Sequence, residues 1–218
     1  MQIIKLDSTH ATAAAQLHIA GQPNTFLTNL GPAVLTTFYR ALPQSPTGFG
    51  FAALAPPNTP DATRNTQHAL PILGFISATT STGQLFLQLG TRHLPAFLPP
   101  LLRRFAQRPT LLLNCIQTVL YPLRHGSSMD TNSGTTAELL SIMVEPAWRS
   151  QGVGAHLLRA LIAECQARRL AALEVTVAAD NTGAQRFYAR HGFVEERHFT
   201  LYGRPMYSYR RLLTGAES

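Results

Sequence analysis

Hydrophobic and polar positions alternate most regularly in the C-terminal half of the chain. The run AELLSIMV at 137–144 is typical of a strand, and from about Gly152 apolar residues recur at the spacing of one helix face. The residues of this predicted helix face are Val153, Leu157, Leu158, Leu161, Ile162 and Cys165. A second strand, a second helix and a final strand pair are predicted at 171–177, 182–192, 193–201 and 204–213. The C-terminal order is therefore strand, helix, strand, helix, strand, strand.

The N-terminal half predicts a short strand, two helices and two further strands, in that order. Their segments are 3–10, 10–21, 31–42, 48–55 and 70–79. A polar loop that contains proline, at 56–67, separates the last two. Because helices and strands are interspersed along the chain, the predicted fold class is α/β or α+β.

The segment from about 85 to 136 departs from this pattern. It predicts two leucine-rich, basic helices at 93–108 and 110–124, each containing or bordered by proline, and then a loop of small polar residues. This helical insertion separates the third predicted strand from the fourth. It could cover a substrate site, form a homodimer interface or contact an anionic surface.

Length and composition predict a single folded domain that spans 1–218. The chain has 218 residues, of which 45% are hydrophobic and 13% charged, and this composition excludes a disordered chain. No run approaches the length of a membrane span, and the start MQIIKLD lacks the apolar core of a signal peptide. Cys115 and Cys165 lie in apolar patterns without metal-ligand spacing. They indicate buried free thiols, and therefore a cytoplasmic protein.

The net charge of +7 is unevenly distributed along the chain. No Asp or Glu lies between Asp61 and Asp130, and the arginines in that interval are Arg64, Arg92, Arg103, Arg104, Arg108 and Arg124. Such a field favours a polyanionic partner, which could be nucleic acid, a membrane surface or a phosphorylated cofactor. No nucleic-acid-binding motif accompanies the charge, so we expect no nucleic acid partner.

Two glycines one residue apart stand where the 137–144 strand leads into the following helix. Glycine costs about 1 kcal/mol relative to alanine inside a helix, so Gly152 and Gly154 indicate that something approaches the backbone closely. A helix N-terminus offers unpaired N–H groups and a partial positive charge, and Arg149 adds a guanidinium beside it. RSQGVG therefore predicts a pyrophosphate-binding turn. It lacks the third glycine of the dinucleotide fingerprint and the Gly-Lys-Ser/Thr of a Walker loop.

Around this turn the chain resembles the GCN5-related N-acetyltransferases (GNAT). Their core motif is Arg/Gln-x-x-Gly-x-Gly/Ala between the fourth strand and the third helix, and here it reads Arg149-Ser150-Gln151-Gly152-Val153-Gly154. The family then shows an Asn after the fifth strand and an aromatic pair before Gly-Phe. Asn181 and the segment RFYARHGF, with Tyr188, match these features in order and spacing. The resemblance implies the GNAT fold, a mixed central sheet flanked by helices, with 85–136 inserted where relatives have a short turn.

The resemblance also implies that acetyl-CoA is the co-substrate and that no metal is required. The acetyl-CoA-binding residues that it implies are Ile142, Met143, Val144, Arg149, Ser150, Gln151, Gly152, Val153, Gly154, Ala155, Asn181 and Tyr188. The three strand residues would pair their backbone with the pantetheine arm, and the turn would hold the pyrophosphate. Asn181 would hydrogen-bond the pantetheine region, and the Tyr188 hydroxyl would lie near the thioester sulfur.

Acetyl transfer to an amine requires a neutral amine, a polarised carbonyl and a proton for the departing thiolate. A phenol with a pKa of about 10, such as that of Tyr188, suits a leaving thiol with a pKa of about 8.5. Glu138 is the candidate base, because an even spacing on a regular strand puts it on the same face as Val144. A bulge of the kind found in this family would change that register. Partial burial would raise the pKa of its carboxyl toward neutrality.

Other candidates for the chemistry are weaker. Glu174 lies on the next strand, and Glu195 and Glu196 follow later in the chain. His156 and His191 are interpreted as helix-face residues, whereas His198 lies on a strand near the expected acceptor site.

The sequence thus predicts an acetyl-CoA-dependent N-acetyltransferase that uses Tyr188 and Glu138 and transfers acetyl directly to a primary amine. The acceptor could be a small molecule or an amine of a protein or peptide. The alternatives are a catalytically silent acyl-CoA-binding module and an enzyme that uses a different acyl-CoA.

Overall fold

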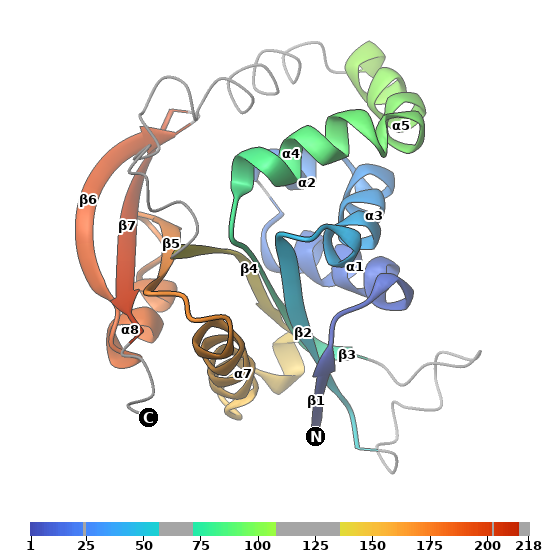
Figure 1. Ribbon diagram of the computed structural model, residues 1–218. Coiled ribbons are helices and arrows are strands. Elements are labelled where there is room, and N and C mark those ends of the chain that lie inside the picture. Colours follow the sequence, from blue (N-terminus) through green and yellow to red (C-terminus); the bar gives the residue numbers. More distant parts are fainter. Residues whose placement is uncertain (24, 57–71, 108–135, 202, 214–218) are drawn as a thin grey trace.

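One mixed β-sheet organises the computed structural model, which describes residues 1–23, 25–56, 72–107, 136–201 and 203–213 (Figure 1). The seven strands lie in the order β1-β2-β3-β4-β5-β7-β6. Their bounds are β1 Gln2–Lys5, β2 Gly48–Leu54, β3 Ile72–Thr79, β4 Thr136–Val144, β5 Ala172–Ala178, β6 Val194–Leu201 and β7 Arg204–Leu212. Strands β4 and β5 pair in parallel, and every other neighbouring pair is antiparallel.

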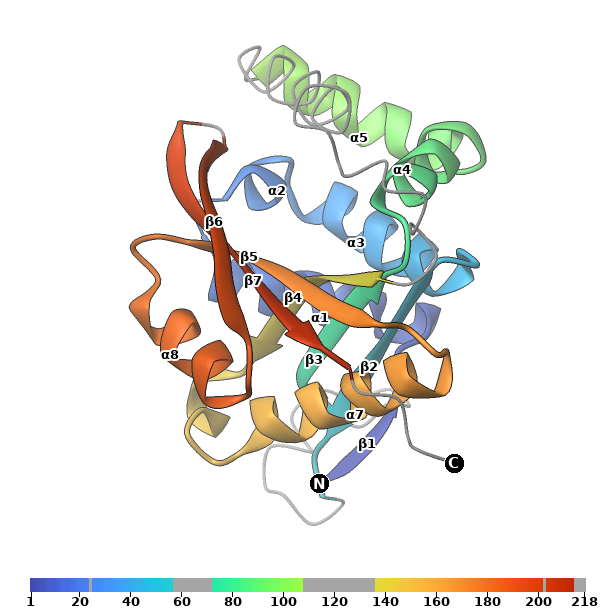
Figure 2. The same ribbon diagram turned by 60° about the vertical axis from the view of Figure 1, so that its left-hand side comes forward.

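Helices cover both faces of this sheet. They are α1 Ala11–Gly21, α2 Phe26–Asn29, α3 Pro32–Ala41, α4 Thr82–Thr91, α5 Leu94–Gln107, α7 Val153–Ala167 and α8 Thr182–Arg190. Helix α7 connects the parallel strands β4 and β5 and lies with α8 on one face, which we call the α7 face (Figure 2). Helices α1, α3, α4 and α5 lie on the other, which we call the α3 face.

Each face of the sheet buries its own hydrophobic cluster. The α7 face packs the apolar side of α7, including Leu157, Leu158 and Leu161, against β2, β3, β4 and β5. All six residues of the predicted helix face are buried there, as the 3.6-residue period requires. The α3 face buries Tyr39 and Phe75 together with the apolar side of α4. The mixed sheet flanked by helices is therefore confirmed.

The parallel strands β4 and β5 are hydrogen-bonded to each other only at their N-terminal ends. Pairing extends only from Thr136 with Ala172 to Leu139 with Val175. Beyond that point β4 remains bonded to β3, and β5 remains bonded to β7. The backbone groups of β4 that point away from β3 therefore face a gap between the strands, which we call the β4–β5 opening.

A β-bulge in β4 overturns one prediction. Ser141 pairs with Ser77 and Leu139 with Ala78, so Leu140 is an extra residue in the ladder. Because a one-residue slip exchanges the two faces of a strand, Glu138 lies on the α3 face, whereas Val144 packs against the α7-face cluster. The prediction that these two residues share a face is wrong.

The segment between β3 and β4 matches its prediction only in part. Helix α5 occupies the first predicted helix at 93–108, and the second, at 110–124, lies outside the described residues. Helix α4 was not predicted, although Leu85 and Leu89 have helical spacing and are buried. The part of the chain that the structure describes contains no helix long and apolar enough to span a membrane.

Candidate active site

The turn that leads into α7 has an unusual backbone. A short 3-10 turn, Pro146–Trp148, follows β4, and then Ser150 and Gly152 both adopt positive φ, at 60° and 81°. Gly152 is the N-cap of α7, and this left-handed conformation explains why glycine stands there. The first N–H groups of α7, from Val153 to Ala155, have no partner within the helix. They form the donor set that the sequence predicts for a pyrophosphate.

Gly154 lies where three elements meet. A Cβ built on it would lie 3.7 Å from Val144 Cγ2 at the end of β4 and 3.6 Å from the Phe187 ring on α8. These are ordinary van der Waals distances, so the fold itself would tolerate alanine here. The absence of a larger side chain leaves space beside the helix N-terminus, at the open end of the β4–β5 opening.

The polar side chains of the turn bind its own backbone. Arg149 Nε donates to the carbonyl oxygen of Val144 at 3.1 Å, and Gln151 Nε2 donates to that of Ala147 at 2.8 Å. His156 Nδ1 lies 2.8 Å from the carbonyl oxygen of Gly152. These bonds fix the turn, so Gln151 and His156 act on it structurally, and the backbone N–H groups at the start of α7 remain the candidate donors for a pyrophosphate.

Tyr188 projects from α8 into the α7-face cluster. It is 3% exposed and packs edge-to-face against Phe187 and Phe193. Burial raises the pKa of the Tyr188 phenol above its ordinary value. The phenol therefore remains protonated through the whole neutral range. Within the described part of the chain its hydroxyl makes no hydrogen bond.

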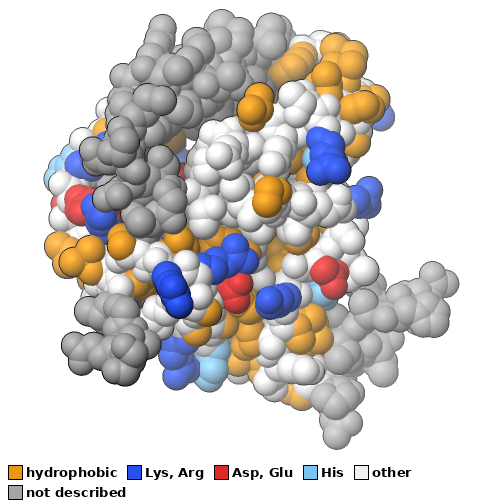
Figure 3. Space-filling model, in the orientation of Figure 1, with side chains coloured by type: hydrophobic (Ala, Val, Ile, Leu, Met, Phe, Trp, Pro, Cys, Tyr) orange, Lys and Arg blue, Asp and Glu red, His pale blue; other side chains and the backbone are white. Residues whose placement is uncertain are grey.

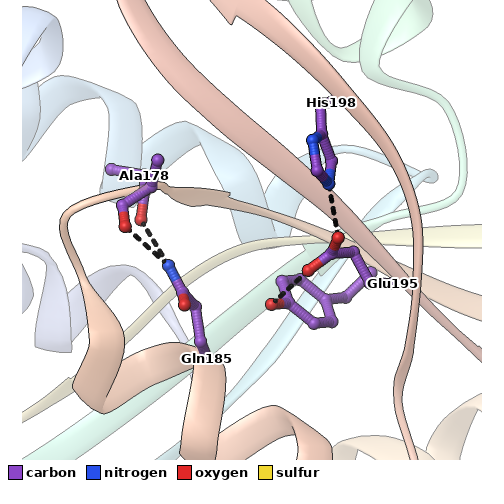
Figure 4. A network of polar contacts seen from close by, with 6 residues as sticks. Ala178, Gln185, Glu195 and His198 are labelled. Carbon is purple, nitrogen blue, oxygen red and sulfur yellow. Dashed lines mark hydrogen bonds and ion pairs between the residues drawn. The ribbon is translucent and has the colours of Figure 1, made fainter.

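Asn181, for which a hydrogen bond to the pantetheine region is predicted, caps helix α8 in the structure. Its side-chain oxygen accepts from the Ala184 N–H at 3.1 Å and so caps α8. Gln185, one turn further on, donates to the carbonyl oxygens of Ala178 and Ala179 at 3.3 and 2.9 Å (Figure 4). Together these bonds fix the start of α8, and with it Tyr188, against the end of β5.

Glu138 lies on the α3 face, next to the point where β4 and β5 separate. The Thr82 hydroxyl of α4 donates to its carboxylate, and Glu174 of β5 is directly opposite in the parallel register. Burial raises the pKa of Glu138, and the nearby Glu174 charge adds to this, while the Thr82 hydrogen bond and Arg197 act in the opposite direction. A partly buried carboxyl with a raised pKa is suited to accept a proton near neutral pH.

Three further charged residues lie beyond Glu138 across the sheet, namely Glu174, Arg210 and Glu196. Glu174 pairs in register with Arg210 of β7, and the nearest atoms of this ion pair are 3.8 Å apart. Arg210 also lies 3.6 Å from Glu196. Glu174 therefore has a cationic neighbour, whereas Glu138 has none within ion-pair distance among the described residues. This difference favours Glu138 as the base, although both carboxylates line the same face.

His198 and Glu195 lie on the opposite face of the sheet from Glu138. His198 contacts Glu195, and the Tyr209 hydroxyl donates to the other carboxylate oxygen at 3.0 Å (Figure 4). Tyr209 belongs to the α7-face cluster. The hydrogen bonds from His198 and Tyr209 lower the pKa of Glu195, so this carboxylate is a poor base. The structure thus separates His198 from the face that carries Glu138.

The sequence missed Thr82 because helix α4 was not recognised. A usable signal was present, since Ser81 precedes an amphipathic run and Ser is a preferred N-cap residue. Glu138, Glu174 and Arg210 are neighbours because β4, β5 and β7 pair in a particular register. That register joins segments far apart in the chain, so a local sequence pattern cannot predict it.

Comparison with known proteins agrees with this geometry. Residues 118–193 match the acetyltransferase (GNAT) family model. A segment of 57 residues is 42% identical to the [ribosomal protein bS18]-alanine N-acetyltransferase of Haemophilus ducreyi. That segment is 26% of this chain and spans 39% of the length of the curated relative.

Solved structures resemble the chain over nearly its whole length. Arabidopsis thaliana NAA60 in complex with acetyl-CoA superposes with a TM-score of 0.59 at 16% identity, covering 98% of this chain and 99% of that one. The ribosomal-protein-S18-alanine N-acetyltransferase from Escherichia coli gives 0.54 at 18% identity, covering 100% and 96%. Such identities establish the shared fold. The segment 118–193, which matches the GNAT family model, lies within this shared fold.

Proposed function

We propose that this protein is an acetyl-CoA-dependent N-acetyltransferase that transfers acetyl directly to a primary amine. The observation that carries the proposal is the β4–β5 opening, with a glycine turn at its open end and a candidate acid and base on its two sides. Tyr188 is buried in the α7-face cluster, and Glu138 lies on the α3 face. A thioester in the opening would therefore meet the amine from one face and release its thiolate on the other.

The residues around the opening fit acetyl-CoA. The segment Ile142–Val144 has a backbone edge that faces away from β3, to which a pantetheine amide can bond as a strand would. The N–H groups at the start of α7 suit the pyrophosphate. Cofactor contacts of Met143 run through its backbone, because its side chain is buried on the α3 face.

The chemistry needs one proton transfer on each face. Bound acetyl-CoA supplies the acetyl thioester. Glu138 accepts the proton of the attacking amine as the N–C bond forms, and the backbone N–H groups of β4 polarise the carbonyl. Tyr188 donates its proton to the sulfur as the C–S bond breaks, and solvent restores the phenol. No acyl-enzyme is required. The Cys165 thiol is buried in the α7-face cluster, where burial raises its pKa to about 12.

Replacing Gly154 with valine should weaken CoA binding by about tenfold or more, since overpacking typically costs 1–3 kcal/mol. The branched side chain would occupy the space beside the α7 N-terminus. Gly154→Ala is the matched control, because its Cβ fits at ordinary distances and the family motif admits alanine there. Calorimetric titration with CoA measures both variants. A folded Gly154→Val protein with wild-type affinity would refute the pyrophosphate assignment.

A peptide or protein N-terminus is the acceptor class that we test first. The relatives named above include enzymes that acetylate an alanine of a ribosomal protein. Small-molecule amines remain the comparison class. The assay is thiol release from acetyl-CoA over a panel of N-terminal peptides, lysine side chains and small primary amines. Release that depends on one amine class identifies the acceptor, whereas CoA binding without release for any amine favours a silent acyl-CoA-binding module. Propionyl-CoA in the same assay tests the use of a different acyl group.

Helix α5 presents an apolar surface that the catalytic proposal does not use. Leu94, Leu98 and Leu102 recur at helical spacing and are 44%, 44% and 58% exposed. Hydrophobic side chains are visible at the upper right of Figure 3, where Figure 1 places α5. Arg92 and Arg103 are also exposed, and no acid lies on α4 or α5. Leucines flanked by arginines suit an anionic lipid surface, where apolar side chains enter the interface and cations meet phosphates.

We therefore expect the protein to sediment with anionic vesicles and not with neutral ones. Leu98→Ser should reduce binding by about tenfold or more, since each buried leucine contributes roughly 1.5–3 kcal/mol. Leu212→Ser, at another exposed leucine, is the control. Equal sedimentation with both vesicle types, or a homodimer that Leu98→Ser dissociates, would contradict the membrane assignment. A cytoplasmic location, expected from the cysteine pattern, remains a prediction that cell fractionation tests.

A further inference from the structure

Helix α4 begins directly over the candidate base. We infer that Thr82, at the first position of this helix, is a positioning residue that holds the Glu138 carboxylate at the closed end of the β4–β5 opening. The inference rests on the proposed function in one respect, namely that Glu138 accepts the amine proton. It adds a role for the segment between β3 and β4, because that segment supplies the group that orients the base.

The turn between β3 and α4 is fixed by its own hydrogen bonds. Thr79, the last residue of β3, is directly opposite Glu138 in the antiparallel register and is fully buried. Its hydroxyl oxygen accepts from the Ser81 N–H at 3.2 Å. The Ser81 side chain then caps α4 by accepting from the Gln84 N–H at 3.3 Å. The position of Thr82 relative to Glu138 is therefore set by strand pairing on one side and a helix cap on the other.

Burial of the apolar side of α4 anchors the helix. Leu85 is fully buried and Leu89 is 7% exposed, both in the α3-face cluster. Because the helix is anchored in this way, the Thr82 hydroxyl is held where it donates a hydrogen bond to the Glu138 carboxylate. The contact joins residues 56 positions apart in the chain, so it is a tertiary contact.

The surroundings explain why Glu138 needs such a donor. Glu174 on β5 repels the carboxylate, and Arg197 on β6 attracts it only as a minor influence. Arg210 on β7 is engaged with Glu174 and Glu196. Among the residues that the structure describes, the Thr82 hydroxyl and the positive end of the α4 dipole are the groups that stabilise the ionised form at close range. Without the hydroxyl, the pKa of Glu138 would rise further, and the side chain would lose its fixed rotamer.

The test is the pH dependence of kcat/KM for Thr82→Val, which removes the hydroxyl at nearly constant volume. Since a raised pKa of Glu138 leaves less of its carboxyl ionised at a given pH, the acidic limb of the pH–rate profile should move to higher pH. Activity below the limb should fall on the order of tenfold or more, because hydrogen bonds to charged groups contribute roughly 1.5–3 kcal/mol. The high-pH plateau should change little. Thr82→Ser should restore the wild-type limb.

Ser81→Ala is the matched control for a merely structural role. It removes the cap of α4 and leaves the Thr82 hydroxyl in place, so it should lower stability without moving the limb. If Thr82→Val and Ser81→Ala depress the rate equally at all pH values, Thr82 only supports the helix and the inference is wrong. An unchanged profile for Thr82→Val overturns it as well.

Failure of the inference can be distinguished from failure of the proposed base. A ¹³C NMR titration of the Glu138 carboxyl in the wild type and in Thr82→Val reports the interaction without requiring turnover. An upward shift in the variant supports the positioning role even if Glu138→Gln leaves the pH–rate profile unchanged, which would reject only the base. No shift in the titration rejects the role of Thr82 and leaves the base assignment intact.

Discussion

Replacing Tyr188 with phenylalanine is expected to lower kcat by about 10²–10⁴-fold, the usual range for removal of a general acid. The affinity for CoA should barely change, because the ring that packs against Phe187 and Phe193 is retained. Stability should also be preserved, since the hydroxyl has no hydrogen-bond partner among the described residues. The effect should be confined to the step in which the thiolate departs.

The loss should be the same across the neutral and mildly basic range. Burial raises the pKa of Tyr188, so the wild-type phenol does not titrate there and the ratio of rates stays constant. Turnover against pH with a competent amine measures this ratio. Tyr209→Phe is the control, because Tyr209 lies on the same face and its hydroxyl bonds Glu195. A wild-type rate for Tyr188→Phe at every pH would mean that solvent protonates the thiolate.

Replacing Glu138 with glutamine should lower turnover at neutral pH by about 10²-fold or more, and the loss should shrink as the pH rises. At higher pH a larger fraction of the amine is already neutral, so the base is needed less. The glutamine side chain has nearly the same volume and can still accept the Thr82 hydrogen bond. Initial rates over a pH series, at saturating acetyl-CoA, show whether the recovery occurs.

Glu174→Gln is the informative companion to Glu138→Gln. The charge of Glu174 raises the pKa of Glu138, so its removal should move the acidic limb to lower pH while the plateau is retained. In the same assay, Glu138→Gln should therefore lower the rate at neutral pH, whereas Glu174→Gln should keep the plateau rate and extend activity to lower pH. If Glu174→Gln abolishes turnover and Glu138→Gln is nearly silent, the base is Glu174, and the assignment drawn from burial is wrong.

Most elements of the fold were predictable because they follow local periods. The apolar face of α7 and the apolar face of β5 repeat at 3.6 and 2 residues, and their burial follows from that spacing. Helix α4 was not predicted from the sequence, because it contains Gly83 and Gly90 and no charged residue. Its two buried leucines form only a short helical pattern.

The site was predictable where it is local in sequence and unpredictable where it depends on register. The turn into α7 and its Gly152 N-cap follow from one short motif, whereas the positive φ of Ser150 does not. The face on which Glu138 lies depends on a single extra residue, Leu140, and any count along a regular strand misplaces it. The contact with Thr82 requires knowing where α4 begins over the sheet.

Direct acetyl transfer across the β4–β5 opening is tested most directly by single-turnover thiol release from acetyl-CoA, with and without amine. The experiment mixes excess protein with acetyl-CoA and follows both the free thiol and the mass of the protein and the amine. We predict no release without amine, and with a competent amine one equivalent of thiol together with one equivalent of N-acetylated product. A burst of thiol without amine, leaving acetyl on the protein, would contradict direct transfer. Tight binding of acetyl-CoA with no release for any amine would contradict the enzymatic function itself.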